Sequence, residues 1–323
     1  MRDAPGLDID EPGHGVRSDP PAKPPRQWGQ TRSAMWRRLT PYLLLLPAFL
    51  VVGAVLVYPM MDTIRRSFYD WPFGAPFELE FVGVENFEAL FSGSRGFVQS
   101  LAFTGIFVGA TIAIEFVFGF GVALTLDRLR RGRSVLAAVA IAPYMVAPVA
   151  VGLVWQLILN RDAGLMNYVL GFLGMEPVSW LAQTTEAAFS VVLAEVWRSL
   201  PFVMLILLGG LTAVPDTVLE AARSDGASEI QVFRYVIRPL LMPAIAVALI
   251  FQTIFKLRVF DLIVTLTAGG PGTDTTPLGL FIHRLFFRYF EGGLASATSV
   301  VLLVVGGVIT LVYMRFVYRE VQY

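Results

Sequence analysis

The chain has 323 residues, of which 55% are hydrophobic and only 15% are charged, and its formal net charge is zero. A composition this apolar excludes a soluble globular domain and favours a membrane protein. The sequence contains no cysteine, which excludes disulfides and thiolate chemistry, and the balanced charge gives no support to nucleic-acid binding.

The N-terminal residues 1–35 are rich in Pro, Gly, Asp and Arg and lack apolar periodicity, so we expect a disordered cytoplasmic tail. A cleavable signal peptide is not expected, because this long tail precedes a full-length apolar run. Residues 36–323 are predicted to form one transmembrane domain.

Six apolar runs follow, and each is near the roughly 20 residues that a helix needs to cross a bilayer. They cover residues 42–61, 101–126, 134–158, 188–211, 240–260 and 293–316. Pro143 and Pro148 interrupt the third run and Pro201 the fourth, and each is expected to bend its helix. The predicted fold class is therefore all-α, a polytopic membrane protein with six transmembrane helices.

The basic residues predict the orientation of these helices. Sixteen Arg and Lys residues lie in the tail, the 127–133 and 212–239 loops and the C-terminal end, against six in the three alternate loops. Because basic loops stay in the cytoplasm, we expect both termini and the 212–239 loop to be cytoplasmic.

Two stripes of polar and aromatic side chains recur at helical spacing on the fourth and fifth runs, where buried charge is costly and indicates a solute path. They are Glu195, Arg198, Ser199 and Phe202 on the fourth run, and Gln252, Phe255, Lys256 and Val259 on the fifth. Such stripes suit a sugar, whose hydroxyls bind charged and amide groups and whose rings stack on aromatics.

Other roles for these side chains remain open. Glu195 and Arg198, one turn apart, could form a satisfied ion pair, and Lys256 and Arg258 could reach water at the outer end of the fifth run. Glu115 in the second run is expected to join helices more than to bind a ligand. Further candidate lining residues are Tyr144, Trp155 and Gln156 in the third run.

The polar segment 217–239 between the fourth and fifth runs predicts two short helices with a sharp joint. Thr217 and Glu220 form a T-x-x-E capping box for the first helix, which Asp225 and Gly226 would close with a positive φ. Ser228 and Gln231 would open the second helix. Pro239 is expected to end it before the fifth run.

This segment resembles the EAA loop of the membrane subunits of bacterial ATP-binding-cassette (ABC) importers. The matching residues are Glu220-Ala221-Ala222, Gly226 and Val236-x-Arg238-Pro239, although the family usually has Leu where Arg238 stands. The segments 81–87 and 266–272 resemble the carbohydrate-uptake branch, which contains the maltose and trehalose permeases. The resemblance implies that the loop grips an ATPase subunit through Glu220, Ala221, Ala222, Asp225, Gly226 and Pro239.

The resemblance further implies a permease subunit that moves a sugar or sugar derivative across the bacterial cytoplasmic membrane by alternating access. Its implied partners are a second permease chain, two ATPase subunits and an extracytoplasmic sugar-binding protein. The chain itself would be no enzyme and would hold no cofactor or metal, because ATP and Mg²⁺ bind the ATPases. This chain has the motif W-x-x-x-P at Trp197 and Pro201. In the maltose permease, the positions that correspond to the surroundings of this motif and to the residues before the Gly-Gly-Pro loop contribute to the substrate site. The resemblance therefore implies that the same two stripes contact substrate here.

Two other function classes agree less well with the sequence. An ion-coupled secondary transporter could use Glu115, Glu195 and Lys256 as a relay, but it would need neither an ATPase nor a two-helix loop. An intramembrane enzyme lacks candidate groups, because the sequence has no cysteine and no histidine within a predicted span.

Overall fold

The computed structural model describes residues 30–72, 74, 79–93, 95–129 and 131–316. The described part is almost entirely helical, and its strands are the short antiparallel pair β1 (Tyr69–Asp70) and β2 (Glu80–Phe81). The chain divides into two compact units, Met1–Tyr58 and Pro59–Tyr323. The predicted tail lies outside the described residues as far as residue 29, and the first described helix, α1 (Gln30–Val52), begins at Gln30.

Within the described residues, five helical segments are long and apolar enough to cross a membrane, which confirms five of the six predicted runs. They are Thr40–Arg66, made of the part of α1 from Thr40 on, the π-helical turn η1 (Gly53–Val57) and α2 (Tyr58–Arg66); Phe97–Arg128 (α4); Thr184–Thr212 (α8); Glu229–Leu257; and Gly292–Arg315 within α14 (Gly292–Phe316).

The third predicted run is not one helix. Its first half, α5 (Arg133–Ile141) and the 3-10 turn η2 (Ala142–Met145), meets α6 (Pro148–Ile158) at a bend of 95°. Pro148 begins α6, a position where the missing N–H costs nothing. Gly152 lets α6 pack closely on α12 (Asp261–Leu266), since a Cβ there would lie 1.8 Å from Thr265 Oγ1.

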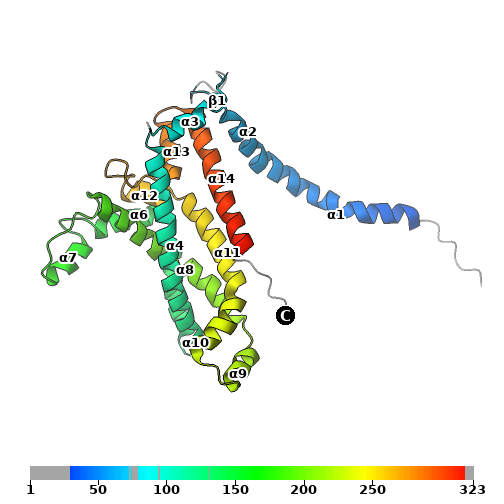
Figure 1. Cartoon of the computed structure of the whole chain (residues 1–323), viewed down its shortest axis with the longest axis vertical. Helices are drawn as coiled ribbons and strands as arrows, with labels where there is room; N and C mark the ends of the chain where they lie inside the picture. The colour runs from blue at the N-terminus through cyan, green and yellow to red at the C-terminus, as the bar shows by residue number, and fades with distance from the viewer. Residues whose placement is uncertain (1–29, 73, 75–78, 94, 130, 317–323) are drawn as a thin grey trace, which may run out of the picture. The chain divides into compact units, whose positions relative to one another are not determined.

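Within the second unit, three long helices pack together around a set of buried polar groups. The helices α4 and α8 run alongside each other, and α11 (Arg238–Leu257) packs against both (Figure 1). Small residues permit this approach: a Cβ on Gly119 would lie 3.4 Å from Val203 Cγ1, and one on Gly210 would lie 2.7 Å from Leu241 Cδ1. On the other side of α11, α14 packs against it and against α13 (Leu278–Phe287).

The connections between spans are held by side chains that bond to backbone carbonyls. In the segment 81–87, Asn86 on α3 (Glu85–Phe91) donates from Nδ2 to Ser67 O and Tyr69 O, both at 3.0 Å. In the loop between α12 and α13, Arg284 donates to Ala268 O at 2.6 Å and to Thr276 Oγ1 at 2.9 Å. Asn167 on α7 (Leu165–Phe172) plays the same part in the loop before α8.

The first helix of the 217–239 segment, α9 (Asp216–Ser224), begins one residue before the predicted cap. Pro215 is its N-cap residue and makes no side-chain capping bond, so Thr217 already lies inside the first turn and the predicted Thr217–Glu220 capping box is wrong. The predicted joint is confirmed. Gly226 has φ +82°, and the N–H of Ala227 reaches back to Ala222 O at 3.1 Å.

The second helix of this segment is α10 (Glu229–Val232), and its predicted capping box is confirmed. Ser228 Oγ accepts from the Gln231 N–H at 3.4 Å, and Gln231 Oε1 accepts from the Ser228 N–H at 2.8 Å. Reciprocal bonds of this kind satisfy two backbone donors that a helix start leaves free.

Pro239 does not end the second helix, contrary to the prediction. The chain passes from α10 through a π-helical turn, η3 (Phe233–Ile237), directly into α11. In this turn Arg238 N–H bonds to Phe233 O, five residues back, which widens the helix just before the proline. A proline ring otherwise clashes with the carbonyl four residues earlier, and the wider turn relieves that clash. The second short helix and the fifth span are therefore one segment, Glu229–Leu257.

Candidate functional site

A buried network of charged groups joins α4, α8 and α11. Lys256 is fully buried, and its Nζ lies 2.6 Å from Glu195 Oε1 and 2.9 Å from Glu115 Oε1. Arg198 adds a bidentate pair with Glu195, Nη2 to Oε1 at 2.7 Å and Nε to Oε2 at 3.1 Å. Two acids face two bases, so the network balances its own charge, as buried ions require.

Two uncharged side chains complete the network. The Ser199 hydroxyl contacts Glu115 Oε1 and Lys256 Nζ, and it lies 2.7 Å from the carbonyl oxygen of Glu195 one turn earlier. Gln252 Nε2 donates to the Ser199 carbonyl at 3.3 Å, which links α11 to α8 a second time. Five of the eight predicted stripe residues thus meet at one place.

Glu115 belongs to the network although the sequence analysis left it outside the predicted site. It is fully buried on α4 and supplies the second carboxylate for Lys256. Its sequence signal is that it is an acid inside an apolar span, which demands a partner but does not name one.

The sequence left two other roles open for these charges, an ion pair and contact with water, and the structure supports only the first for the buried groups. The ion pair between Glu195 and Arg198 is present. Lys256 does not reach water, because its burial between two carboxylates places it inside the helix bundle, whereas Arg258 at the end of α11 is exposed. Snorkelling is therefore wrong for Lys256.

A cavity of about 360 Å³ opens beside the network. It is lined by Tyr144, Arg198, Ser199, Gln252, Phe255 and Arg258. The ring of Phe202 packs against two of these residues, with its centroid 5.6 Å from that of Tyr144 and 5.7 Å from that of Phe255. The cavity therefore combines aromatic faces with amide, hydroxyl and guanidinium groups, the mixture that binds a hydroxylated ring.

Three other predicted lining residues lie elsewhere. Val259 comes after the last residue of α11, Leu257, so helical spacing no longer applies and its side chain packs against the apolar core. Trp155 is buried against Trp197, with ring centroids 6.1 Å apart. Gln156 lines a separate cavity near the loop before α8.

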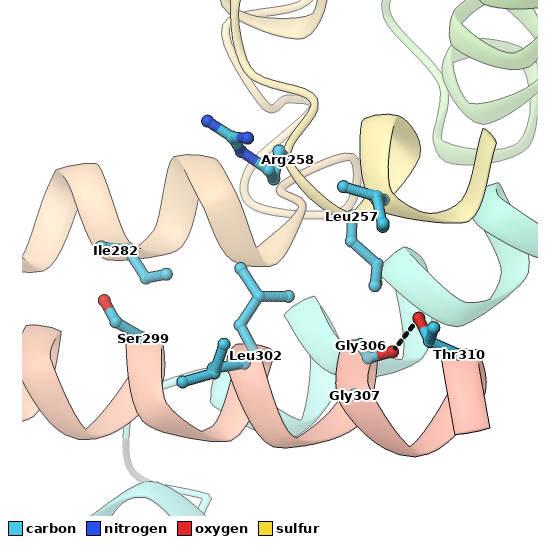
Figure 2. A pocket seen from close by; sticks show the side chains of 10 residues that line it. Leu257, Arg258, Ile282, Ser299, Leu302, Gly306, Gly307 and Thr310 are labelled. Carbon is cyan, nitrogen blue, oxygen red and sulfur yellow. Dashed lines mark hydrogen bonds between the residues drawn. The ribbon is translucent and has the colours of Figure 1, made fainter. Parts of the chain in front are cut away.

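A second hollow, between α11, α13 and α14, differs in chemistry. It encloses about 440 Å³, and its wall is mainly aliphatic, with Ile254, Leu257, Ile282, Leu302 and Leu303. Figure 2 shows the side chains that line it between the helices, with Arg258 at one edge. Few polar groups face this hollow, so it does not suit a sugar.

The predicted ATPase-coupling residues lie on α9, at the joint between α9 and α10, and, for Pro239, in the first turn of α11. Glu220, Ala221, Asp225, Gly226 and Pro239 are exposed, and Ala222 is half-buried. Large apolar side chains are exposed beside them, with Ile230 at 78% and Tyr235 at 68% of their full accessibility. Arg223 Nε, 3.0 Å from Glu229 Oε1, ties α9 to α10. Exposed apolar side chains that lie together are typical of a protein interface.

A family model matches most of the chain. Residues 115–323 match the family model of the binding-protein-dependent transport system inner membrane component. The chain belongs to this family. The resemblance to importer permeases is thereby confirmed, and the protein is a multi-pass membrane permease.

Several permeases are similar to this one over nearly their whole length. The trehalose/maltose transport system permease protein MalF of Thermococcus litoralis is 38% identical over 85% of this chain and 92% of its own. The sulfoquinovosyl glycerol transport system permease protein SmoG of Agrobacterium fabrum is 32% identical over 87% and 91%. The trehalose transport system permease protein SugA of Mycobacterium tuberculosis is 31% identical over 89% and 92%.

A solved structure shares the permease fold. A chain of a bacterial ABC transporter that imports the acidic polysaccharide alginate superposes with a TM-score of 0.76 at 22% identity, covering 91% of this chain and 100% of its own. The all-α transmembrane fold predicted from the sequence is thus confirmed.

Proposed function

We propose that this permease is the transmembrane subunit of an ABC importer that moves a sugar or sugar derivative across the cytoplasmic membrane. The observation that carries the proposal is the cavity lined by Tyr144, Arg198, Gln252 and Phe255, whose rings and hydrogen-bonding groups suit a carbohydrate. Permeases for trehalose, maltose and sulfoquinovosyl glycerol are similar over almost the whole chain, which supports the same substrate class.

The family implies the partners. A second permease chain would close the other side of the path, an extracytoplasmic binding protein would deliver the solute, and two ATPase subunits would bind ATP and Mg²⁺. The permease itself would therefore be non-catalytic. The ion-coupled alternative has less support, because Glu115, Glu195 and Lys256 satisfy one another's charge and the family works with a binding protein.

The coupling segment, residues 216–239, connects the proposed ATPase contact to the cavity. We assign ATPase contact to Glu220, Ala221, Ala222, Asp225, Gly226 and Pro239, with the last residue already inside the helical segment Glu229–Leu257. This one segment also carries Gln252 and Lys256 near its other end. A displacement of the loop by a closing ATPase would therefore be carried along the helix to the cavity, which alternating access requires.

The direct test is to purify the complete importer with its binding protein, reconstitute it, and measure ATP hydrolysis with maltose, trehalose and a range of other sugars. We expect at least one sugar to stimulate hydrolysis and to be taken up. Stimulation by amino acids or inorganic ions, with none by any sugar, would overturn the proposed substrate class.

Gln252→Leu should weaken sugar recognition while the complex stays intact. The change removes the amide group from the residues that line the cavity, and a substrate hydroxyl left unpaired costs about 1–3 kcal/mol, or roughly a tenfold to hundredfold loss of apparent affinity. Uptake at graded sugar concentrations measures it. Gln156→Leu is the matched control, because Gln156 lines a different cavity. Equal losses in both variants would contradict a specific role for Gln252.

The orientation is a separate proposal, with both termini in the cytoplasm. A reporter fused after Arg130 or Asp225 should report cytoplasm, and one fused after Ser94 or Gly272 should report the outside, because basic residues concentrate in the predicted cytoplasmic loops. Activity of paired alkaline phosphatase and fluorescent protein fusions measures the side. An outside signal after Asp225 would place the coupling segment away from any ATPase and invert the topology.

A further inference from the structure

One cation on the cavity wall stands apart from the ion network. Arg258 is the first residue after α11, and it lines the cavity together with Arg198. Arg198 is already paired in bidentate fashion with Glu195. Arg258 forms no ion pair with any described residue, and Asp261, three residues later on α12, is not bonded to it.

The charges around the cavity do not cancel. Glu195 balances Arg198, which lines the wall, and Glu115 and Glu195 balance Lys256 behind it, at contact distances of 2.6–2.9 Å. On the wall itself none of the described lining residues is acidic, and Arg258 remains. Among the described lining residues, Arg258 is therefore the one cation without an ionic partner. A buried network that is neutral by itself leaves this charge free to attract an anion.

Arg258 lies between two hollows of different chemistry. Arg258 also borders the aliphatic hollow between α11, α13 and α14, where a guanidinium would find no hydrogen-bonding partner of opposite charge. Figure 2 shows its guanidinium turned away from Leu302 and Gly306, which form the floor of that hollow. Its charged end therefore lies at the edge of the aliphatic hollow and not among the aliphatic side chains.

We infer that the permease prefers a sugar bearing an anionic group, a carboxylate or a sulfonate, and that Arg258 is the residue that selects it. In this arrangement the guanidinium of Arg258 binds the anion in bidentate fashion, and the faces of Phe255 and Tyr144 hold the ring. Gln252, whose Nε2 also donates to the Ser199 carbonyl, offers its remaining amide hydrogen-bonding groups to the ring hydroxyls. The inference rests on the proposed sugar import and adds the charge of the substrate.

The experiment compares pairs of sugars with the same rings, in which one member carries an anionic group where the other carries a neutral one. The reconstituted importer, with its binding protein, is given digalacturonic acid or its neutral counterpart α-1,4-galactobiose, and sulfoquinovosyl glycerol or its neutral counterpart glucosylglycerol. Maltose and trehalose are included as further neutral sugars. The half-maximal concentration for uptake is measured for the wild type and for Arg258→Gln, Arg258→Lys and the control Arg288→Gln. Arg288 is an exposed arginine at the end of α13 that does not line this cavity.

We expect the wild type to take up at least one anionic sugar at a lower half-maximal concentration than its neutral counterpart. Arg258→Gln should raise that concentration about tenfold to a hundredfold for the anionic sugar and much less for the neutral one, because a charge-assisted hydrogen bond is lost. Arg258→Lys should restore part of the preference, and Arg288→Gln should leave it unchanged.

The failures of the two proposals are distinguishable. Uptake of neutral sugars with no preference for the charged counterparts, or an anion preference that survives Arg258→Gln, overturns the role of Arg258 and leaves sugar import standing. Stimulation of the wild-type importer by amino acids or inorganic ions, with uptake of no sugar, overturns both.

Discussion

Lys256→Met should strongly destabilise the permease. It leaves the carboxylates of Glu115 and Glu195 buried without the ammonium group that lies 2.9 Å and 2.6 Å from them. Breaking a buried ion pair by removing one partner typically costs about 3–5 kcal/mol, because the remaining charge stays uncompensated. The expected result is a large drop in the unfolding temperature of the purified complex and loss of uptake.

The double variant Lys256→Met with Glu115→Gln separates charge balance from packing. It restores neutrality, because Glu195 keeps Arg198 as its partner at 2.7 Å. It should therefore regain much of the stability that the single variant loses, and Glu115→Gln alone should be destabilised as well. A thermal unfolding series of the four proteins forms a double-mutant cycle. If the stability lost in the double variant equalled the sum of the losses in the two single variants, the coupling of Lys256 on α11 to Glu115 on α4 would be refuted.

Gly226→Val should abolish transport while leaving the permease in the membrane. The backbone at Gly226 has φ +82°, which costs a residue with a Cβ about 1–2 kcal/mol and is most unfavourable for a β-branched side chain. A Cβ there would meet no described atom within 4 Å, so the defect comes from the backbone and not from a clash. Relief of this strain changes the angle between α9 and α10, and with it the surface offered to the ATPase.

Gly226→Asn is the matched control, because asparagine tolerates a positive φ far better than valine does. It should retain most of the uptake. Sugar uptake, the amount of permease in isolated membranes and co-purification of the ATPase subunits are measured together. Normal uptake by Gly226→Val, or loss of both variants from the membrane, would refute a coupling role for this joint.

Local patterns in the sequence were sufficient for the helices and for the joint of the coupling segment. Apolar runs of about 20 residues have few stable structures other than membrane helices, because a bilayer satisfies no backbone hydrogen bonds. A glycine that closes a helix, followed by Ser228 and Gln231, encodes its turn within a few residues. Helical spacing also placed Glu195, Arg198 and Ser199 correctly on one face of α8.

Helix boundaries already depended on more than local pattern. Pro239 is a strong stop signal by itself, but the π-helical turn at Phe233–Ile237 accommodates it inside a longer helix. Val259 fits the stripe spacing only if α11 continues, and α11 ends at Leu257. The prolines of the third run indicate a bend. The angle of 95° between its two halves goes with the tertiary packing of α6 on α12, where Gly152 meets Thr265.

What the sequence alone determined is therefore the class of protein, its spans and the polar faces of α8 and α11. Only the tertiary structure decided that Glu115 on α4 completes the network, that Lys256 turns inward between two acids, and that Arg258 lines the cavity without an ion pair to any described residue. The reason is physical. Most faces of a membrane helix are apolar, so periodicity does not reveal which helices adjoin, and the partner of a buried charge is fixed by packing between spans distant in sequence.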